Sequence, residues 1–377
     1  MESYVKGKTD DFEDIIDFGN YVFGIDFKEL LPKLYNGKVD NSSNHFLVKD
    51  SNKIKAMVGC FPLGLNVMDV NLKVAGIGTV SVHPYARDKG YMIKLMEKAI
   101  SEMKEESIDF AILGGQRQRY EYFGFTPTGS QVIFEVNRVN LKHKKVCYDN
   151  KISFNSLDDL SEDDLKSNYI LFNKQSVHGS RDLSNFVDVC KSWNSRPLGV
   201  YYEDEIIGYV ILSNKSDKIL EIYLKNYEIL GKILSNLIAD FDKDKLDVVV
   251  APHRHELIEY LSSICELYKI QPSTCLNIFN YKNFIKAFLR LKNNCETLEK
   301  GQLIIEILGR EKIIISVEKD VTVELAQGTP DIKLSHLEAM NFLCCPLRTL
   351  KYEKLGVSNL IKSWFPLDFC FPEIDNV

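Results

Sequence analysis

The chain has 377 residues, of which 45% are hydrophobic, and its formal net charge is −6. This length predicts two or three domains, and the ordinary apolar fraction predicts a sizeable buried core. The negative charge excludes general binding to nucleic acids or to anionic membranes, because both require a basic excess.

The cysteines and the first residues of the chain indicate the cellular compartment in which the protein is expected. The nine cysteines are scattered and form no C-x-x-C pair, so neither a zinc site nor a disulfide framework is indicated. The start, MESYVKGKTDDFED, is polar and acidic, and no apolar run approaches the roughly 18 residues that span a bilayer. We therefore expect a reduced, soluble protein of the cytoplasm, without a metal, a signal peptide or a membrane anchor.

The first unit, residues 1 to about 140, mixes helical and strand patterns. Its predicted elements are a helix at 10–24 and strands at 44–50, 53–65, 72–82, 108–115 and 130–136. The continuous apolar run at 108–115 is typical of a central strand. The strand at 130–136 is expected to end the unit, and the basic, unpatterned stretch at 137–146 is expected to be a linker.

A second unit, from about 150 to 285, repeats a similar order. Its elements are a hairpin at 196–214 that turns at 203–205, a strand at 219–224, a helix at 228–241 and a strand at 245–252. From about 286 onward, short strands with turn signals occupy 301–328 and helical patterns follow. We therefore expect domains at 1–145, 146–285 and 286–377.

The stretch VSVHPYARDKGYMIKLM, at 80–96, joins a strand to a helix through a basic turn. A helix N-terminus presents unpaired N–H groups and a partial positive charge, so it binds anions. Gly90 has no Cβ and lets a phosphate approach the backbone, while Arg87 and Lys89 add counter-charge. The turn suits a pyrophosphate, although a solvated turn with incidental cations explains these residues alone equally well.

A second stretch, RYEYFGF at 119–125, follows the apolar strand. Together the two stretches resemble the GCN5-related N-acetyltransferases (GNAT), whose motifs are V-x-V-x-P, then Q/R-x-x-G-x-G/A, then Y-x-x-x-G-F. The matching residues are Val80, Val82 and Pro84, then Arg87, Gly90 and Met92, then Tyr120, Gly124 and Phe125. Met92 departs from the preferred Gly or Ala.

The wider layout resembles the Eis family of acetyltransferases, whose members commonly carry a bulky apolar residue where this chain has Met92. The resemblance implies an α/β (α+β) chain with two acyl-CoA N-acyltransferase folds in tandem and a C-terminal domain similar to sterol carrier proteins. It also implies a homohexamer, acetyl-CoA as donor, and a cationic amine as acceptor, either an aminoglycoside or a lysine or polyamine. The implied acetyl-CoA site comprises Val80, Val82, Arg87, Asp88, Lys89, Gly90, Tyr91 and Met92.

The second unit is expected to be degenerate, because only KNY, at 225–227, separates its strand from its helix. Without a basic turn and glycine there is no site for a pyrophosphate. We therefore expect a single acetyl-CoA site in each chain.

Acetyl transfer to an amine needs an acid at the leaving sulfur and a base for the amine proton. The resemblance assigns the acid to Tyr120, whose alternative role is that of a core aromatic residue among Tyr122, Phe123 and Phe125. Val82 would offer its N–H to the acetyl oxygen, and its alternative is an ordinary ladder hydrogen bond.

The resemblance also places acidic groups beside the amine. Asp26 matches an acidic position of the family pocket, but it equally suits the N-cap of a helix at 27–35. The chain end supplies Glu373, Asp375 and the carboxylate of Val377, which is the expected base. Its alternative is a frayed terminus, although the aromatic side chains of this segment predict that it is anchored by burial: Trp364, Phe365, Phe369 and Phe371.

Two functions remain open on the sequence. The first is an acetyl-CoA-dependent amine N-acetyltransferase, and the second is a non-catalytic ligand-binding or assembly protein on the same scaffold. His253 and His255 lack a cluster of further ligands, so a solvated loop is expected there rather than a metal site.

Overall fold

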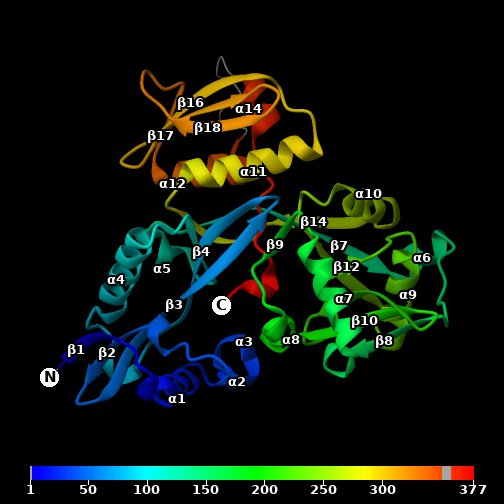
Figure 1. Ribbon diagram of the computed structural model, residues 1–377, viewed down its shortest axis with the longest axis horizontal. Coiled ribbons are helices and arrows are strands. Elements are labelled where there is room, and N and C mark those ends of the chain that lie inside the picture. The colour runs from blue at the N-terminus through cyan, green and yellow to red at the C-terminus, as the bar shows by residue number, and fades with distance from the viewer. Residues whose placement is uncertain (1, 350–357) are drawn as a thin grey trace.

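The computed structural model describes residues 2–349 and 358–377, and its strands form three sheets (Figure 1). The first and second sheets lie side by side, and the third lies above them with α11 on its underside. In the described ranges, no helix is both long and apolar enough to cross a membrane.

The first sheet has the order β1-β2-β3-β4-β5-β15-β6, with β9 paired to β3. Its strands are β1 (Glu2–Lys6), β2 (His45–Asp50), β3 (Lys53–Val67), β4 (Val70–Val82), β5 (Phe110–Leu113), β6 (Thr126–Thr128), β9 (Val177–Gly179) and β15 (Thr274–Ile278). The helices of this part are α1 (Phe12–Phe23), α2 (Phe27–Leu30), α3 (Pro32–Tyr35), α4 (Tyr91–Glu105) and α5 (Arg117–Tyr120). The helix and the first four strands expected from the sequence are confirmed.

The second sheet repeats this order as β8-β10-β11-β12-β13-β7-β14. Its strands are β7 (Gln131–Asn137), β8 (Ile152–Ser156), β10 (Arg196–Tyr202), β11 (Glu205–Leu212), β12 (Lys218–Leu224), β13 (Lys245–Val250) and β14 (Leu267–Gln271). Its helices are α6 (Arg138–His143), α7 (Glu162–Asn173), α8 (Phe186–Lys191), α9 (Leu230–Asp240) and α10 (His255–Ile264).

The two sheets exchange one strand each, which the sequence analysis missed. β7 was expected to complete the first sheet, but it pairs with β13 and β14 of the second. β15 comes after all strands of the second sheet in the chain. It nevertheless lies in the first sheet, where it pairs with β5 and β6 in the position that was expected for β7. The expected boundary near residue 145 therefore does not follow the sheets. The expected linker at 137–146 is also wrong in part, because it contains α6, capped by the Asn137 side chain.

The third sheet has the order β18-β17-β16-β19 and rests on α11. Its elements are α11 (Tyr281–Cys295), β16 (Gly301–Ile307), β17 (Lys312–Val317), β18 (Val321–Leu325), β19 (Ile332–Leu334), α12 (His336–Cys344), α13 (Pro346–Thr349) and α14 (Ser358–Trp364). Phe284 and Phe288 of α11 share one core cluster with Val74 and Phe110 of the first sheet. The third sheet is thus joined to the first through a continuous apolar core.

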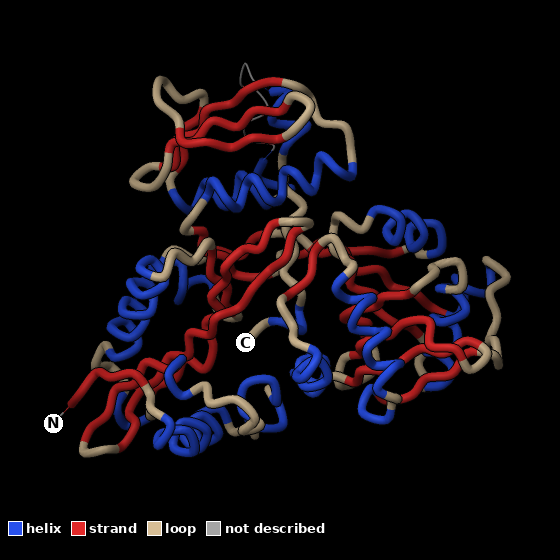
Figure 2. Tube along the Cα trace, viewed as in Figure 1, coloured by secondary structure: helices blue, strands red, loops and turns tan. Residues whose placement is uncertain are grey.

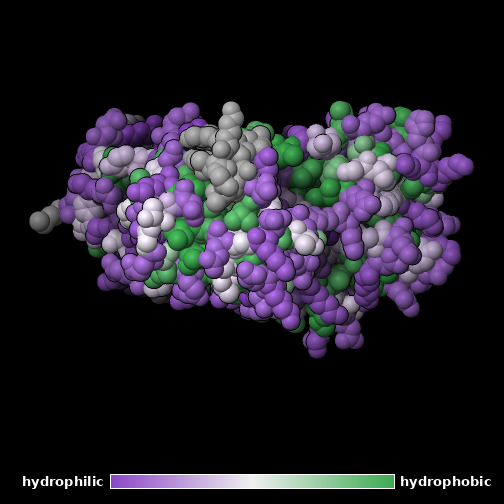
Figure 3. Space-filling view, turned by 90° about the horizontal axis from the view of Figure 1, so that it is seen from above, coloured by the Kyte–Doolittle hydropathy of each residue, from purple (hydrophilic) through white to green (hydrophobic). Residues whose placement is uncertain are grey.

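The C-terminal tail, residues 365–377, leaves the third sheet and runs down between the first and second sheets, where the chain ends (Figures 1 and 2). Seen from above the third sheet, the surface is largely hydrophilic, with hydrophobic side chains scattered among polar ones (Figure 3).

Candidate functional site

The basic turn, residues 87–90, leads into α4 as the sequence predicted. Gly90 is the N-cap of α4, with φ +71°, a left-handed conformation that favours glycine. A Cβ placed on Gly90 would meet no atom within 4 Å, so the space in front of the helix is open. The unpaired N–H groups of the first turn of α4 therefore face a space that fits a phosphate group.

The two cations of this turn, Arg87 and Lys89, differ in whether another residue of the protein already binds them. Lys89 lies 3.6 Å from Glu2, which also accepts a hydrogen bond from the Tyr91 hydroxyl. Tyr91 and Glu2 raise the pKa of Lys89, so it stays charged. Arg87 and Asp88 are exposed. Arg87 is thus the cation of the turn that is free for a ligand, while Lys89 is shared with Glu2.

Beyond the turn, β4 has an open edge that the sequence did not reveal. β4 pairs with β5 only from Val74 to Ile77, where it faces Leu113. Just past this point Thr79 adopts φ +49°, and the pairing of β4 with β3 shifts register. Backbone groups from Gly78 to Val82 consequently have no described strand partner on the β5 side, so an extended ligand can bind along them.

Tyr120 ends α5 beside this open edge, and it is only 7% exposed. Its ring lies so close to Gly115 that a Cβ there would collide with it. No described residue makes a hydrogen bond to its hydroxyl group. Burial raises the pKa of Tyr120, so the phenol keeps its proton at neutral pH. The Tyr120 ring belongs to a core cluster of the first sheet, and Met92 packs against that cluster.

The C-terminal tail is anchored by burial, as its aromatic residues predicted. The side chain of Trp364, which precedes the tail, is almost fully buried. So are four side chains of the tail itself: Phe365, Leu367, Phe369 and Phe371. Phe369 packs on Phe110, Phe284 and Phe288. The expectation of an anchored tail is therefore confirmed, and the alternative of a frayed terminus is excluded by this packing.

Glycines make room for the last residues of the tail. A Cβ on Gly76 would lie 2.5 Å from the Val377 side chain, and one on Gly78 would lie 3.0 Å from the Val377 carboxyl carbon. A Cβ on Gly179 would collide with the Asp375 carboxylate. Gly76 and Gly78 therefore bring the terminal residue against β4, next to its open edge.

Two residues that the sequence analysis missed hold the end of the tail. Lys33 of α3 donates hydrogen bonds to the carbonyl groups of Ile374 and Asn376, at 2.6 and 2.5 Å. The Trp193 indole N–H donates to the Asn376 carbonyl at 3.2 Å. Burial lowers the pKa of Lys33 to about 7, although Asp375 opposes this shift. Neither residue belongs to a sequence motif, because both act across the fold.

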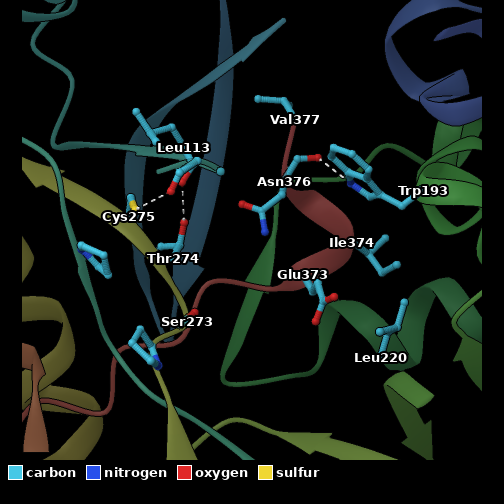
Figure 4. A pocket seen from close by; sticks show the side chains of 14 residues that line it. Leu113, Trp193, Leu220, Ser273, Thr274, Cys275, Glu373, Ile374, Asn376 and Val377 are labelled. Carbon is cyan, nitrogen blue, oxygen red and sulfur yellow. Dashed lines mark hydrogen bonds between the residues drawn. The ribbon is translucent and has the colours of Figure 1, made fainter. Parts of the chain in front are cut away.

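The tail lines an open cavity of about 480 Å³ between the first and second sheets (Figure 4). Val377, Asn376 and Glu373 line one side of this tail cavity, and Gly115 and Cys275 line the other. Tyr120 does not itself line the tail cavity, but its ring lies against Gly115, which does.

The expected acidic residues differ in their surroundings. Asp26 is exposed, and its carboxylate accepts the Lys28 N–H at 2.8 Å, so the structure favours the N-cap interpretation. Asp375 is buried against Arg181, at 2.8 and 3.0 Å, and does not line the tail cavity. Its expected substrate-binding role therefore does not fit this geometry. Glu373 lines the cavity and pairs with Lys218 at 2.8 Å.

In the second sheet, the corresponding edge of β12 is occupied by side chains of the protein. Past the paired part of β12, the Tyr227 hydroxyl contacts the Leu224 N–H and the Ile222 carbonyl. Arg254 donates to the same Ile222 carbonyl at 3.0 Å. Tyr227 and Arg254 therefore bind backbone groups of β12 in the second sheet, whereas the corresponding backbone groups of β4 in the first sheet have no described strand partner on the β5 side.

The histidines of residues 253–255 are placed differently from each other. His253 is half-buried before α10, whereas His255 is exposed at its first position. Within residues 2–349 and 358–377, no three His, Cys, Asp or Glu side chains gather in a group that could hold a metal ion.

Substitution of Gly90 tests the phosphate-binding role of the basic turn. Gly90→Glu places a carboxylate and a strained left-handed backbone in front of α4, so acetyl-CoA affinity should fall by more than tenfold, or about 1.4 kcal/mol. Gly309→Glu is the matched control, because Gly309 has the same φ of +71° and equally open space in the third sheet. Calorimetry should show one site per chain in the unaltered protein, and equal affinity for both variants would contradict this role.

Residues 3–128 match the family model described as an acetyltransferase (GNAT) domain. No curated protein matches the chain. Three solved structures are similar over nearly all of it. They are a "Probable N-Acyltransferase" of Enterococcus faecalis V583 (13% identity, 98% of this chain and 97% of that one, TM-score 0.70), a GCN5-related N-acetyltransferase of Anabaena variabilis ATCC 29413 (15%, 100% of both, 0.69) and Eis1 of Mycobacterium abscessus (12%, 99% and 98%, 0.65). At these identities the likeness is one of fold.

Proposed function

We propose that the chain transfers an acetyl group from acetyl-CoA directly to a cationic primary amine, because residues 3–128 match the family model described as an acetyltransferase (GNAT) domain. The observation that carries this proposal is the tail cavity, which is lined by Val377 beside the open edge of β4 and by Gly115, on which the Tyr120 ring packs. The basic turn and the N-terminus of α4 would hold the pyrophosphate, and acetyl-CoA would supply the activated acyl group.

The residues of the site have separate tasks in this reaction. The uncharged amine nitrogen bonds to the acetyl carbon while the carbon–sulfur bond breaks. Tyr120 gives its proton to the leaving sulfur, and the Val377 carboxylate accepts the proton that the amine loses. The Val82 N–H stabilises the negative charge that develops on the acetyl oxygen. The remaining contribution is the positioning of the two reactants within one cavity.

The terminal carboxylate needs help to act as a base. An α-carboxyl group has an ordinary pKa of roughly 3.5, so it is a weak proton acceptor in water. Val377 is 9% exposed and belongs to an apolar cluster with Phe27, Leu34 and Phe61. Burial disfavours the charged form of a carboxylate and so strengthens it as a base.

Release of free CoA thiol, measured with acetyl-CoA and a panel of primary amines, tests the proposed function. We expect release that depends on the amine and that is abolished when the amine is omitted. Tight acetyl-CoA binding without release by any amine would instead favour a non-catalytic ligand-binding protein.

The pH dependence of kcat/KM tests the acid. Because burial holds the pKa of Tyr120 above its ordinary value of about 10, its protonated form persists through the neutral and mildly alkaline range. As pH rises from about 6 to 10, the amine loses its proton, so kcat/KM should rise without a falling limb. A falling limb centred near pH 8 would show that the acid is a different group.

A further inference from the structure

The buried acidic residues around the tail already have cationic partners. The Arg181 side chain is fully buried, and it binds Asp375 through two nitrogens and Glu221 through two. Its guanidinium also lies 4.2 Å from the centre of the Phe172 ring. A ligand ammonium group could bind Asp375 only by separating this network and leaving Arg181 buried without its partner, which is unfavourable.

The acid that lines the tail cavity is also paired. Glu373 binds Lys218 at 2.8 Å, and the Lys218 side chain is only 24% exposed. Lys33 lies beside the tail as well, with its amino group bound to two carbonyl groups of the tail. Asp26 is an exposed helix cap that does not line the cavity.

The Val377 carboxylate is therefore the anion left for a substrate. In the part of the chain that the structure describes, no lysine or arginine forms an ion pair with it. One free negative charge can accommodate one ammonium group. Each additional ammonium group of a polycation would have to give up water without an anionic partner, close to the positive charge of Lys218.

Apart from Ser273, Thr274 and Asn376, the rest of the cavity wall consists of apolar side chains and glycines. Leu113, Leu220 and Ile374 face it, together with Trp193, whose ring lies across the cavity from β5 (Figure 4). The hydroxyl groups of Ser273 and Thr274 are engaged with the backbone, at Phe371 and Leu113. The Trp193 side chain is 37% exposed and is held by Asn376, so a flat ring can pack on it without disturbing the fold.

From this distribution of charge, we propose that the acceptor is a monoamine with an apolar, preferably aromatic, body rather than a polycation such as an aminoglycoside or a polyamine. The proposal rests on the proposed acetyl transfer at the same site. The ammonium group would lie at Val377, lose its first proton to water and its second, on acetyl transfer, to the Val377 carboxylate, and the apolar body would pack against Trp193. A cavity of about 480 Å³ is within the range of small-molecule sites.

Competing amines provide the first test. We expect kcat/KM for 2-phenylethylamine to exceed that for spermidine and for kanamycin by tenfold or more. Faster turnover of spermidine or kanamycin would overturn this inference and leave the proposed function standing. No turnover of any amine would overturn the proposed function itself, so the two failures are distinguishable.

Two variants test the assigned contacts. Trp193→Ala should lower kcat/KM for 2-phenylethylamine by about tenfold relative to ethylamine, and Trp193→Phe should restore most of the difference.

Lys218→Met frees Glu373 and should shift preference toward spermidine. Lys232→Met is its matched control, because Lys232 pairs with Asp149 on another part of the second sheet and should leave the preference unchanged. An equal loss for both amines in Trp193→Ala, or no shift in Lys218→Met, would contradict the proposal.

Discussion

Replacement of Tyr120 by phenylalanine should lower kcat by roughly a hundredfold or more while acetyl-CoA binding persists. The ring is buried among core residues, and its hydroxyl group has no hydrogen-bond partner among the described residues. Removing this oxygen therefore costs no internal hydrogen bond, and the fold should be kept. A loss of turnover can then be assigned to the missing proton donor.

Tyr122→Phe is the matched control for this substitution. Tyr122 lies two residues further along the chain and is 74% exposed. Its hydroxyl group should contribute nothing to turnover. Normal kcat in Tyr120→Phe, measured by CoA release at saturating substrates, would make Tyr120 a packing residue and contradict its assignment as the acid.

Extension of the chain beyond Val377 should lower turnover by about tenfold to a hundredfold, with little change in acetyl-CoA affinity. An added residue turns the terminal carboxylate into a neutral amide, and the space beside Gly76 and Gly78 is already filled by Val377. Deletion of Asn376 and Val377 should have a similar effect, because it removes the carboxylate and a carbonyl that binds Lys33 and Trp193.

The control for the extension is a protein in which the same added residues are inserted at the exposed turn of Gly309. This turn lies in the third sheet, away from Val377. Circular dichroism and the thermal midpoint should be alike in the two proteins. If the extended enzyme turns over as fast as the unaltered one, the carboxylate of Val377 is not the base, and Glu373 becomes the next residue to substitute.

The local parts of the fold and site could be predicted from the sequence. The strand, basic turn and glycine before α4 lie within a few residues of one another, so their pattern specifies their geometry. The burial of the tail was likewise readable from Trp364, Phe369 and Phe371, whose large apolar surfaces must leave water.

The strand exchange could not be predicted in the same way. β7 and β15 each have the composition of an ordinary strand, and nothing local distinguishes the sheet that each one joins. The roles of Lys33, Arg181 and Trp193 also depend on partners more than 150 residues away in the chain. Two glycines in β4, Gly76 and Gly78, were the available signal that another segment approaches the strand closely.

Some expectations stay predictions. The hexameric assembly comes from the resemblance alone, as do the roles of Val82 and the terminal carboxylate. The single acetyl-CoA site also stays a prediction, and it agrees with the second sheet, where Tyr227 and Arg254 bind a backbone carbonyl at the corresponding edge.

A single-turnover experiment tests the central claim most directly. The enzyme, in excess over acetyl-CoA, is mixed with 2-phenylethylamine, and the quenched products are identified by mass spectrometry. Direct transfer predicts that the acetyl group leaves acetyl-CoA and appears on the amine nitrogen, with no acetylated enzyme formed on the way. Acetyl-CoA that stays intact while bound, with this amine and with every other primary amine supplied, would contradict the account.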